Sequence, residues 1–306
     1  MKLKLPPAFS LDKEIAVVAL SSAVEWDNCE KSIELLARKG YSLSYNEVEL
    51  RAQEGYLAGS DEMRRKQLIR ALEDNGIGAI FAARGGFGVT RVMEDLDIEL
   101  IRKNPKWLLG FSDITALGML WNIAGLVWLH SPLFTTYHSE PEAVQERTLK
   151  FIESPKSFIG EKILSGKTLV KGEAEGTLFG GNLVMITAML GTPYFPDLTG
   201  KILLIEEIGE EPYRLDRMFT QLRLSGALHK VSGVVAGSFT NCKPKAQKSF
   251  SADEVIAERL GDLSVPVIVA APFGHEPPNY PLPIGARARL NATKGELSLL
   301  DYEGEI

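Results

Sequence analysis

Short apolar segments alternate with helical patterns along the first half of the chain, and this alternation constrains the fold more than any other feature. The apolar run 77–82 precedes a helical pattern over 89–96, and the run 107–111 precedes another over 113–124. Strands that alternate with helices in this way form a parallel sheet that is covered on both faces. We therefore predict an N-terminal α/β domain with a parallel sheet. Its further strands are expected at residues 15–20, 41–48 and 127–129.

The patterning changes after His130, which indicates a second domain. Residues 151–171 are mixed in character and weakly patterned. From residue 172 onward, buried strands and helices return, and the last two extended segments are expected to pair in antiparallel fashion. The sequence therefore predicts an N-terminal domain over 1–150, a linker over 151–171, and a C-terminal α/β domain with a mixed sheet over 172–306.

Composition excludes several classes of function. The 306 residues carry a formal net charge of −6, so the chain lacks the excess of cations that broad nucleic-acid binding requires. No apolar stretch reaches the roughly 18 residues that a membrane span needs. The two cysteines, Cys29 and Cys242, are too few for a disulfide framework or a thiolate zinc site. We expect a globular protein of the cytoplasm with neither nucleic-acid nor membrane partners.

Ser112 stands where the predicted strand 107–111 turns into the helix 113–124. A serine in a tight strand-to-helix turn projects its hydroxyl away from the sheet and beside free helix amides, as in a nucleophile elbow. Gly110, two residues earlier, allows a close backbone approach. Serine is also a common helix cap. The stretch by itself supports a nucleophile and a cap equally.

A serine nucleophile needs a base, and the chain has only four histidines. His275 follows the apolar segment 265–270 on a proline-rich loop, at a position where α/β sheets place functional groups. A plain surface histidine would fit the same pattern. His130 follows an apolar strand and is a second histidine that could line a cleft.

The acid that orients the base is expected at Glu206 or Glu207, which end the predicted strand 201–205. One of these two side chains should point into the cleft, and the pattern alone does not choose between them.

The histidines lack the spacing of metal ligands, so no metal site is expected. Residues 165–168 resemble the end of a phosphate-binding loop but lack its upstream glycine, so no nucleotide cofactor is expected.

Two backbone segments offer hydrogen-bond donors for a developing oxyanion. The amide of Asp113 lies at the predicted start of a helix, where N–H groups have no partner within the helix. The pair Gly85-Gly86 follows the strand 77–82 and can approach a substrate without obstruction by side chains. Removal of one such donor typically costs about 10²–10³ in rate.

Six short motifs follow one another over nearly the whole chain. They are Tyr56-Leu57-Ala58-Gly59-Ser60-Asp61, Ala83-Arg84-Gly85-Gly86-Phe87-Gly88, Gly110-Phe111-Ser112-Asp113-Ile114-Thr115-Ala116-Leu117, Gly180-Gly181-Asn182-Leu183, Ile205-Glu206-Glu207-Ile208-Gly209-Glu210 with Pro212-Tyr213-Arg214-Leu215-Asp216-Arg217, and Phe273-Gly274-His275 with Pro283-Ile284-Gly285. In this order the motifs resemble the LD-carboxypeptidase family of serine peptidases, which includes muramoyltetrapeptide carboxypeptidases and microcin C immunity proteins. Each motif is weak alone, and the six in sequence are specific.

The resemblance implies a Ser-Glu-His triad. The family's nucleophile falls on Ser112, its acid on Glu206 and its base on His275. The resemblance also implies an oxyanion hole formed by the backbone of Gly86 and Asp113. The implied reaction needs no cofactor.

The implied substrate is a murein tetrapeptide, from which the enzyme would release terminal D-alanine by cleaving an L,D-peptide bond during cell-wall recycling in the cytoplasm. The resemblance also implies a homodimer. Because such a substrate ends in a free carboxylate, we consider Arg84, or else Arg214, as its bidentate partner. A structural salt bridge would explain either arginine equally well.

Two other functions fit the sequence less well. A peptidase of the microcin-immunity type would hydrolyse an amide in a peptidyl-nucleotide and would need an aromatic platform for the base; the compact chain favours the recycling enzyme. A catalytically silent protein that binds cell-wall peptides would have little reason to keep the whole triad.

The chain departs from the family at Phe111, where the family often has tyrosine, and at Glu207, where it often has aspartate. Neither position is expected to do chemistry. Ile114 stands where an α/β-hydrolase elbow needs glycine.

Overall fold

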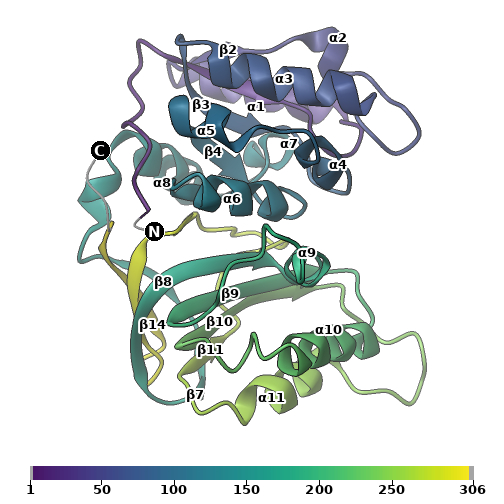
Figure 1. The fold of residues 1–306 in the computed structure, drawn as a ribbon, viewed down its shortest axis with the longest axis vertical. Coiled ribbons are helices and arrows are strands. Elements are labelled where there is room, and N and C mark those ends of the chain that lie inside the picture. The colour runs from purple at the N-terminus through teal and green to yellow at the C-terminus, as the bar shows by residue number, and fades with distance from the viewer. Residues whose placement is uncertain (1–2, 303–306) are drawn as a thin grey trace. The chain divides into compact units, whose positions relative to one another are not determined.

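The computed structural model describes residues 3–302, which form two compact units (Figure 1). The first unit contains residues 3–157 and 281–283, and the second contains residues 158–280 and 284–302. Each unit has a sheet of its own.

A six-stranded sheet lies at the centre of the first unit, in the order β12-β5-β4-β3-β1-β2. The pairings from β2 through β1, β3 and β4 to β5 are all parallel, which confirms the predicted parallel sheet. This order has a topological switch between β1 and β3, and open α/β sheets bind ligands beyond the carboxyl ends of the strands at such a switch. The strands are β1 (Glu14–Val18), β2 (Ser42–Ser44), β3 (Ile77–Ala82), β4 (Trp107–Gly110), β5 (Trp128–His130) and β12 (Leu282–Ile284).

The helices of the first unit form two packed groups. One group contains α1 and α7, and the other contains α3, α4, α5 and α6, which contact one another in series. Between helices and sheet, large side chains such as Phe81, Trp107 and Trp121 are fully buried, and this apolar burial is the main stabilising term. The helices are α1 (Trp26–Arg38), α2 (Glu47–Leu50), α3 (Asp61–Glu73), α4 (Val89–Met93), α5 (Ile98–Lys103), α6 (Ile114–Ile123), α7 (Phe134–Tyr137) and α8 (Glu142–Glu153).

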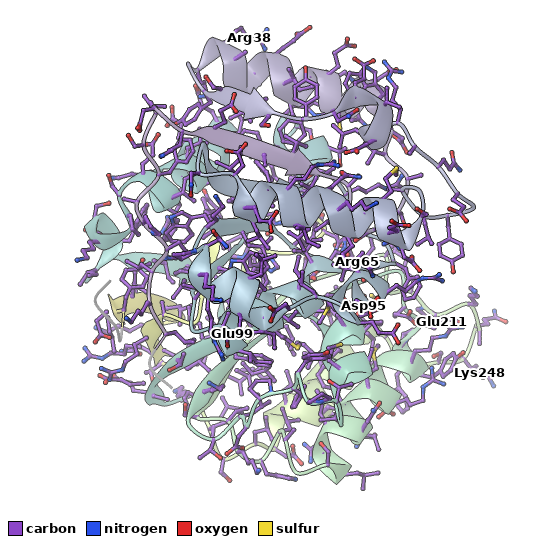
Figure 2. All side chains as sticks on the ribbon, turned by 45° about the horizontal axis from the view of Figure 1, so that its top comes forward. Arg38, Arg65, Asp95, Glu99, Glu211 and Lys248 are labelled. Carbon is purple, nitrogen blue, oxygen red and sulfur yellow. The ribbon has the colours of Figure 1, made fainter. Side chains whose placement is uncertain are left out.

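Ion pairs on the surface of the first unit add little to this core. Arg65 of α3 lies 2.8 Å from the exposed Asp95, and Figure 2 shows the two side chains next to each other. Exposed pairs of this kind contribute about 0–1 kcal/mol to stability. The helices are therefore held in place by their buried faces.

The second unit contains an eight-stranded mixed sheet, in the order β6-β14-β13-β8-β9-β10-β11-β7. The central strands β8 to β11 pair in parallel, and the outer strands pair in antiparallel fashion, which confirms the predicted mixed sheet. The helix α10 packs on both α9 and α11. The elements are β6 (Lys162–Ser165), β7 (Lys167–Val170), β8 (Glu173–Asn182), α9 (Leu183–Met189), β9 (Lys201–Ile208), α10 (Pro212–Leu224), β10 (Gly233–Thr240), α11 (Ala252–Gly261), β11 (Val267–Val269), β13 (Arg287–Asn291) and β14 (Glu296–Asp301).

Two segments differ from the sequence-based expectations. The expected strand 41–48 is cut short by α2, because the side chain of Asn46 accepts a hydrogen bond from the amide of Glu49 and so starts a helical turn. The expected linker 151–171 contains the end of α8, a 3-10 helix (Pro155–Phe158), and the strands β6 and β7. These two strands lie at the edges of the second sheet and have only four residues each, which is too short for a periodic signal.

Within residues 3–302, no helix combines the length and the apolar character needed to cross a membrane.

Candidate active site

Ser112 occupies a strained turn between β4 and α6. Its φ angle is +61°, in the left-handed region that non-glycine residues seldom adopt, and Gly110 two residues earlier has a φ of +153°. The N-cap of α6 is Asp113, so Ser112 lies outside the cap position. A serine cap has an extended backbone, which Ser112 does not have. This geometry is the one expected of a nucleophile elbow and favours the nucleophile over the cap.

The glycine loop that follows β3 lies directly against Ser112. A Cβ atom added to Gly85 would lie 2.9 Å from Ser112 Cβ and 3.1 Å from Ser112 Oγ. Gly86 has a φ of +102°, and a Cβ there would lie 2.2 Å from Ser22 Oγ. Only glycine fits at both positions without displacing a neighbour. The amides of Gly86 and Asp113, predicted as oxyanion donors, thus belong to two segments that adjoin the Ser112 turn.

Buried polar groups hold this arrangement in place. The carboxylate of Asp113 is 1% exposed, and its Oδ2 atom accepts hydrogen bonds from Ser21 Oγ at 2.6 Å and from the amide of Val89 at 2.8 Å. Burial raises the pKa of Asp113, and the two hydrogen bonds act in the opposite direction. The guanidinium of Arg64, fully buried, donates to the carbonyls of Leu20 at 2.5 Å and Gly88 at 2.7 Å. The segment that follows β1, the glycine loop and the start of α6 are therefore tied together.

Glu206 and His275 form a buried pair in the second unit. Glu206 Oε2 lies 2.6 Å from His275 Nδ1, and the Glu206 side chain is fully buried while that of His275 is 13% exposed. Gly274 has a φ of +122°, and a Cβ there would lie 3.0 Å from Glu206 Oε2. The amide of Gly274 donates to Asn279 Oδ1 at 3.0 Å, which fixes the histidine loop. An acid that accepts a hydrogen bond from Nδ1 selects the imidazole tautomer in which Nε2 can act as a base.

Glu207 points to the opposite face of β9, as alternation along a strand requires. Its two oxygens accept hydrogen bonds from Asn182 Nδ2 at 3.0 Å and from the amides of Val184 at 2.7 Å and Ile208 at 2.8 Å. Burial raises the pKa of Glu207 to about 7. Of the two acids that the strand pattern left open, Glu206 contacts the histidine and Glu207 anchors the start of α9.

The other predicted candidates have structural partners of their own. Arg84 Nη1 donates to the carbonyl of Ala23 at 2.5 Å and lies 3.9 Å from Glu25, with 43% of its side chain exposed. Arg214 lies 3.4 Å from Glu210. His130, expected as a cleft candidate, is 1% exposed and packs between the rings of Phe111 and Trp128, so it is a core residue.

The structure also places residues that the sequence analysis does not single out. The amide of Ser22 donates to the carbonyl of Gly85, and its hydroxyl oxygen accepts from the amide of Phe87, both at 3.2 Å. Ser22 is therefore hydrogen-bonded to the glycine loop on either side of Gly86. Arg64 lies on the buried stripe of α3, three and four residues before the buried Gln67 and Leu68. An arginine within an apolar helical stripe is a signal that could have identified it. Nothing local to Ser22 gives a comparable signal.

Residues 165–168, which resemble the end of a phosphate-binding loop, form the turn from β6 into β7. No helix begins there, so the amides of a helix N-terminus are absent from this described segment. Among residues 3–302, no three His, Cys, Asp or Glu side chains are grouped in a way that would hold a metal ion.

Comparison with known proteins identifies the family. Residues 15–131 match the N-terminal domain of the LD-carboxypeptidases, and residues 175–290 match their C-terminal domain. The chain therefore belongs to the LD-carboxypeptidase family. The enzyme is a serine-type LD-carboxypeptidase, which confirms the class that the motifs indicate.

Three relatives show how far the similarity extends. A putative carboxypeptidase of Synechocystis is 38% identical over 292 residues, which cover 94% of each chain. The crystal structure of a muramoyltetrapeptide carboxypeptidase from Oxalobacter formigenes matches with a TM-score of 0.84 and 30% identity, over 95% of this chain and 100% of that one. The structure of MccF in complex with glutamyl sulfamoyl guanosine matches with a TM-score of 0.88 and 21% identity, over 98% and 99%, which shows a shared fold.

Proposed function

We propose that this enzyme releases terminal D-alanine from murein tetrapeptides by means of a triad formed by Ser112, His275 and Glu206. The observation that carries the proposal is the 2.6 Å contact between the fully buried Glu206 carboxylate and His275 Nδ1. A buried acid in this position orients the imidazole and stabilises its cationic form. The strained turn at Ser112 supplies the matching nucleophile.

In the proposed mechanism, Nε2 of His275 takes the proton from Ser112 Oγ as this oxygen attacks the scissile carbonyl. The amides of Gly86 and Asp113 donate to the oxyanion of the tetrahedral intermediate. His275 then gives its proton to the departing amine, and D-alanine leaves. A water molecule, deprotonated by His275, hydrolyses the acyl-enzyme and regenerates Ser112. Glu206 accepts the hydrogen bond from Nδ1 throughout and so holds the proton on this nitrogen.

Two considerations support a murein peptide as the substrate. The family match indicates an LD-carboxypeptidase, and a relative that is 30% identical over nearly all of this chain bears the name muramoyltetrapeptide carboxypeptidase. The peptide ends in a carboxylate, for which Arg84 is the candidate partner because its guanidinium is partly exposed and follows β3 next to the glycine loop. The proposal includes a cytoplasmic location and a homodimer; light scattering of the purified protein tests the latter.

The test is release of D-alanine from purified murein tetrapeptide, with a tetrapeptide that ends in L-alanine as the matched control. We expect release from the first substrate alone, because the site would be shaped for an L,D bond. Equal hydrolysis of both peptides would contradict the stereochemical assignment. If neither peptide is cleaved and a peptidyl-nucleotide amide is, the microcin-immunity activity replaces the proposal. If nothing is cleaved and the tetrapeptide binds, the protein is a silent binder.

A further inference from the structure

Two exposed aromatic rings, Tyr56 and Phe87, lie beside the glycine loop in the first unit and have no part in the mechanism above. Their ring centroids are 6.0 Å apart with an angle of 55° between the planes. Tyr56 is 60% exposed and Phe87 is 45% exposed. Large exposed aromatic side chains that are paired next to a functional loop indicate a contact surface rather than core packing.

The backbone that carries both rings is held firmly. The amide of Ala23 donates to the carbonyl of Tyr56 at 3.1 Å, and Ser22 forms a bridge with Leu57. Ser22 also accepts from the amide of Phe87 at 3.2 Å. The main chain of both residues is therefore tied to the same segment, which follows β1 at the topological switch of the sheet. A backbone that is already ordered lowers the conformational entropy that is lost when a ligand binds there.

The position of Phe87 relates the ring pair to the reacting centre. Phe87 directly follows Gly86, the predicted oxyanion donor, and Gly85 lies against Ser112. A substrate whose carbonyl reached Gly86 would have its neighbouring groups next to the ring of Phe87. One ion pair lies next to Tyr56, since Arg91 interacts with this side chain and pairs with Asp61 at 2.7 Å. The exposed area that two rings offer is far smaller than the ~800 Å² per partner of a stable protein interface. It matches a ligand group of the size of one sugar ring or one aliphatic side chain.

We propose that Tyr56 and Phe87 form a substrate-binding surface that packs against an apolar C–H face of the bound murein substrate. This inference rests on the proposed function and adds a binding subsite to it. The C–H face comes from the sugar ring of a muramoyl peptide or from an aliphatic side chain of the peptide itself. Contact with an aromatic face favours either group through dispersion and burial of apolar area.

The test compares Phe87→Ala and Tyr56→Ala with the wild type on two substrates, the free murein tetrapeptide and the same peptide attached to N-acetylmuramic acid. We expect each substitution to raise KM about three- to tenfold with kcat nearly unchanged, because an aromatic contact contributes binding in the ground state and transition state alike. Phe87→Tyr and Tyr56→Phe should restore the wild-type KM because they keep the rings. Leu11→Ala is the matched control, since Leu11 is 60% exposed and precedes the amino end of β1, whereas the glycine loop follows the carboxyl end of β3.

Comparison of the two substrates identifies which part of the substrate provides the C–H face. A rise in KM for both substrates assigns the contact to the peptide, and a rise for the muramoyl peptide alone assigns it to the sugar. An unchanged KM for both substrates in active variants would overturn the proposal, and so would a lower kcat at unchanged KM, which would make the rings supports of the loop. Absence of D-alanine release by the wild type would instead overturn the proposed function itself.

Discussion

Glu206 Oε2 lies 2.6 Å from His275 Nδ1, and the acid that makes this contact is fully buried. The next residue along β9, Glu207, faces the other side of the sheet and accepts two N–H groups at the start of α9, from Asn182 and Val184, and the amide of Ile208 in its own strand. Two adjacent carboxylates thus have different environments because side chains alternate along a strand. One is placed to orient a base, and the other joins a strand to a helix.

Glu206→Gln should abolish most of the activity while leaving the fold intact. The amide has nearly the same shape, but it can donate its own N–H toward His275 and so favour the wrong tautomer of the imidazole. Replacement of the acid by its amide in a serine triad lowers kcat about 10⁴-fold. Steady-state kinetics of D-alanine release measures the loss, and circular dichroism checks the fold. Activity within tenfold of the wild type would remove Glu206 from the triad.

Gly85→Ala should impair catalysis through steric conflict with the nucleophile. The added Cβ would lie 2.9 Å from Ser112 Cβ, so Ser112 or the glycine loop must move. Displacement of reacting groups by about 1 Å can cost on the order of 10² in rate. Gly261→Ala is the control, because a Cβ there meets nothing within 4 Å. Equal kcat/KM values for the two variants would show that the loop does not constrain Ser112.

Glu207 should make the stability of the protein depend on pH. Burial raises the pKa of this acid from 4.5 to about 7 in the folded state, so the folded protein binds more protons than the unfolded chain between these values. The free energy of unfolding should therefore fall as pH rises from about 4.5 to about 7, by up to about 3 kcal/mol from this group. Urea titrations at several pH values measure the slope, and Glu207→Gln should flatten it. The same slope in both proteins would contradict this assignment.

Arg84→Ala should raise KM for the tetrapeptide about tenfold with little effect on kcat, if the guanidinium binds the terminal carboxylate. Arg84→Lys, which keeps the charge but loses the bidentate geometry, should give an intermediate KM. The arginine also donates to the carbonyl of Ala23, so thermal denaturation must accompany the kinetics. Unchanged kinetics in the alanine variant would leave Arg84 with its structural role alone.

The fold of the first unit could be predicted largely from sequence because its strands and helices carry strong apolar periodicity. The turn at Ser112 was also accessible, since a buried run changes to helical spacing at that residue. Pattern alone could not choose Glu206 over Glu207, because the choice depends on the register of β9 and on the path of the loop that carries His275. Family resemblance supplied that choice.

The interactions that hold the site were not accessible from local sequence. Ser22, Leu57 and Gly85 belong to three segments that are far apart in the chain and meet only in the folded unit. The short strands β6 and β7 could not be predicted from the sequence pattern, because they form by pairing with the distant strands β14 and β11. Tertiary pairing therefore determines both the edges of the second sheet and the rigidity of the glycine loop.

The most direct test of the central claim is D-alanine release from murein tetrapeptide by Ser112→Ala beside the wild type. Ser139→Ala, at an exposed serine of the same unit, serves as the control. We predict that Ser139→Ala keeps full activity and that Ser112→Ala loses it by a factor on the order of 10⁶, as when the serine of a comparable triad is removed. Release by Ser112→Ala at a rate close to that of the wild type would contradict the assignment of Ser112 as the nucleophile.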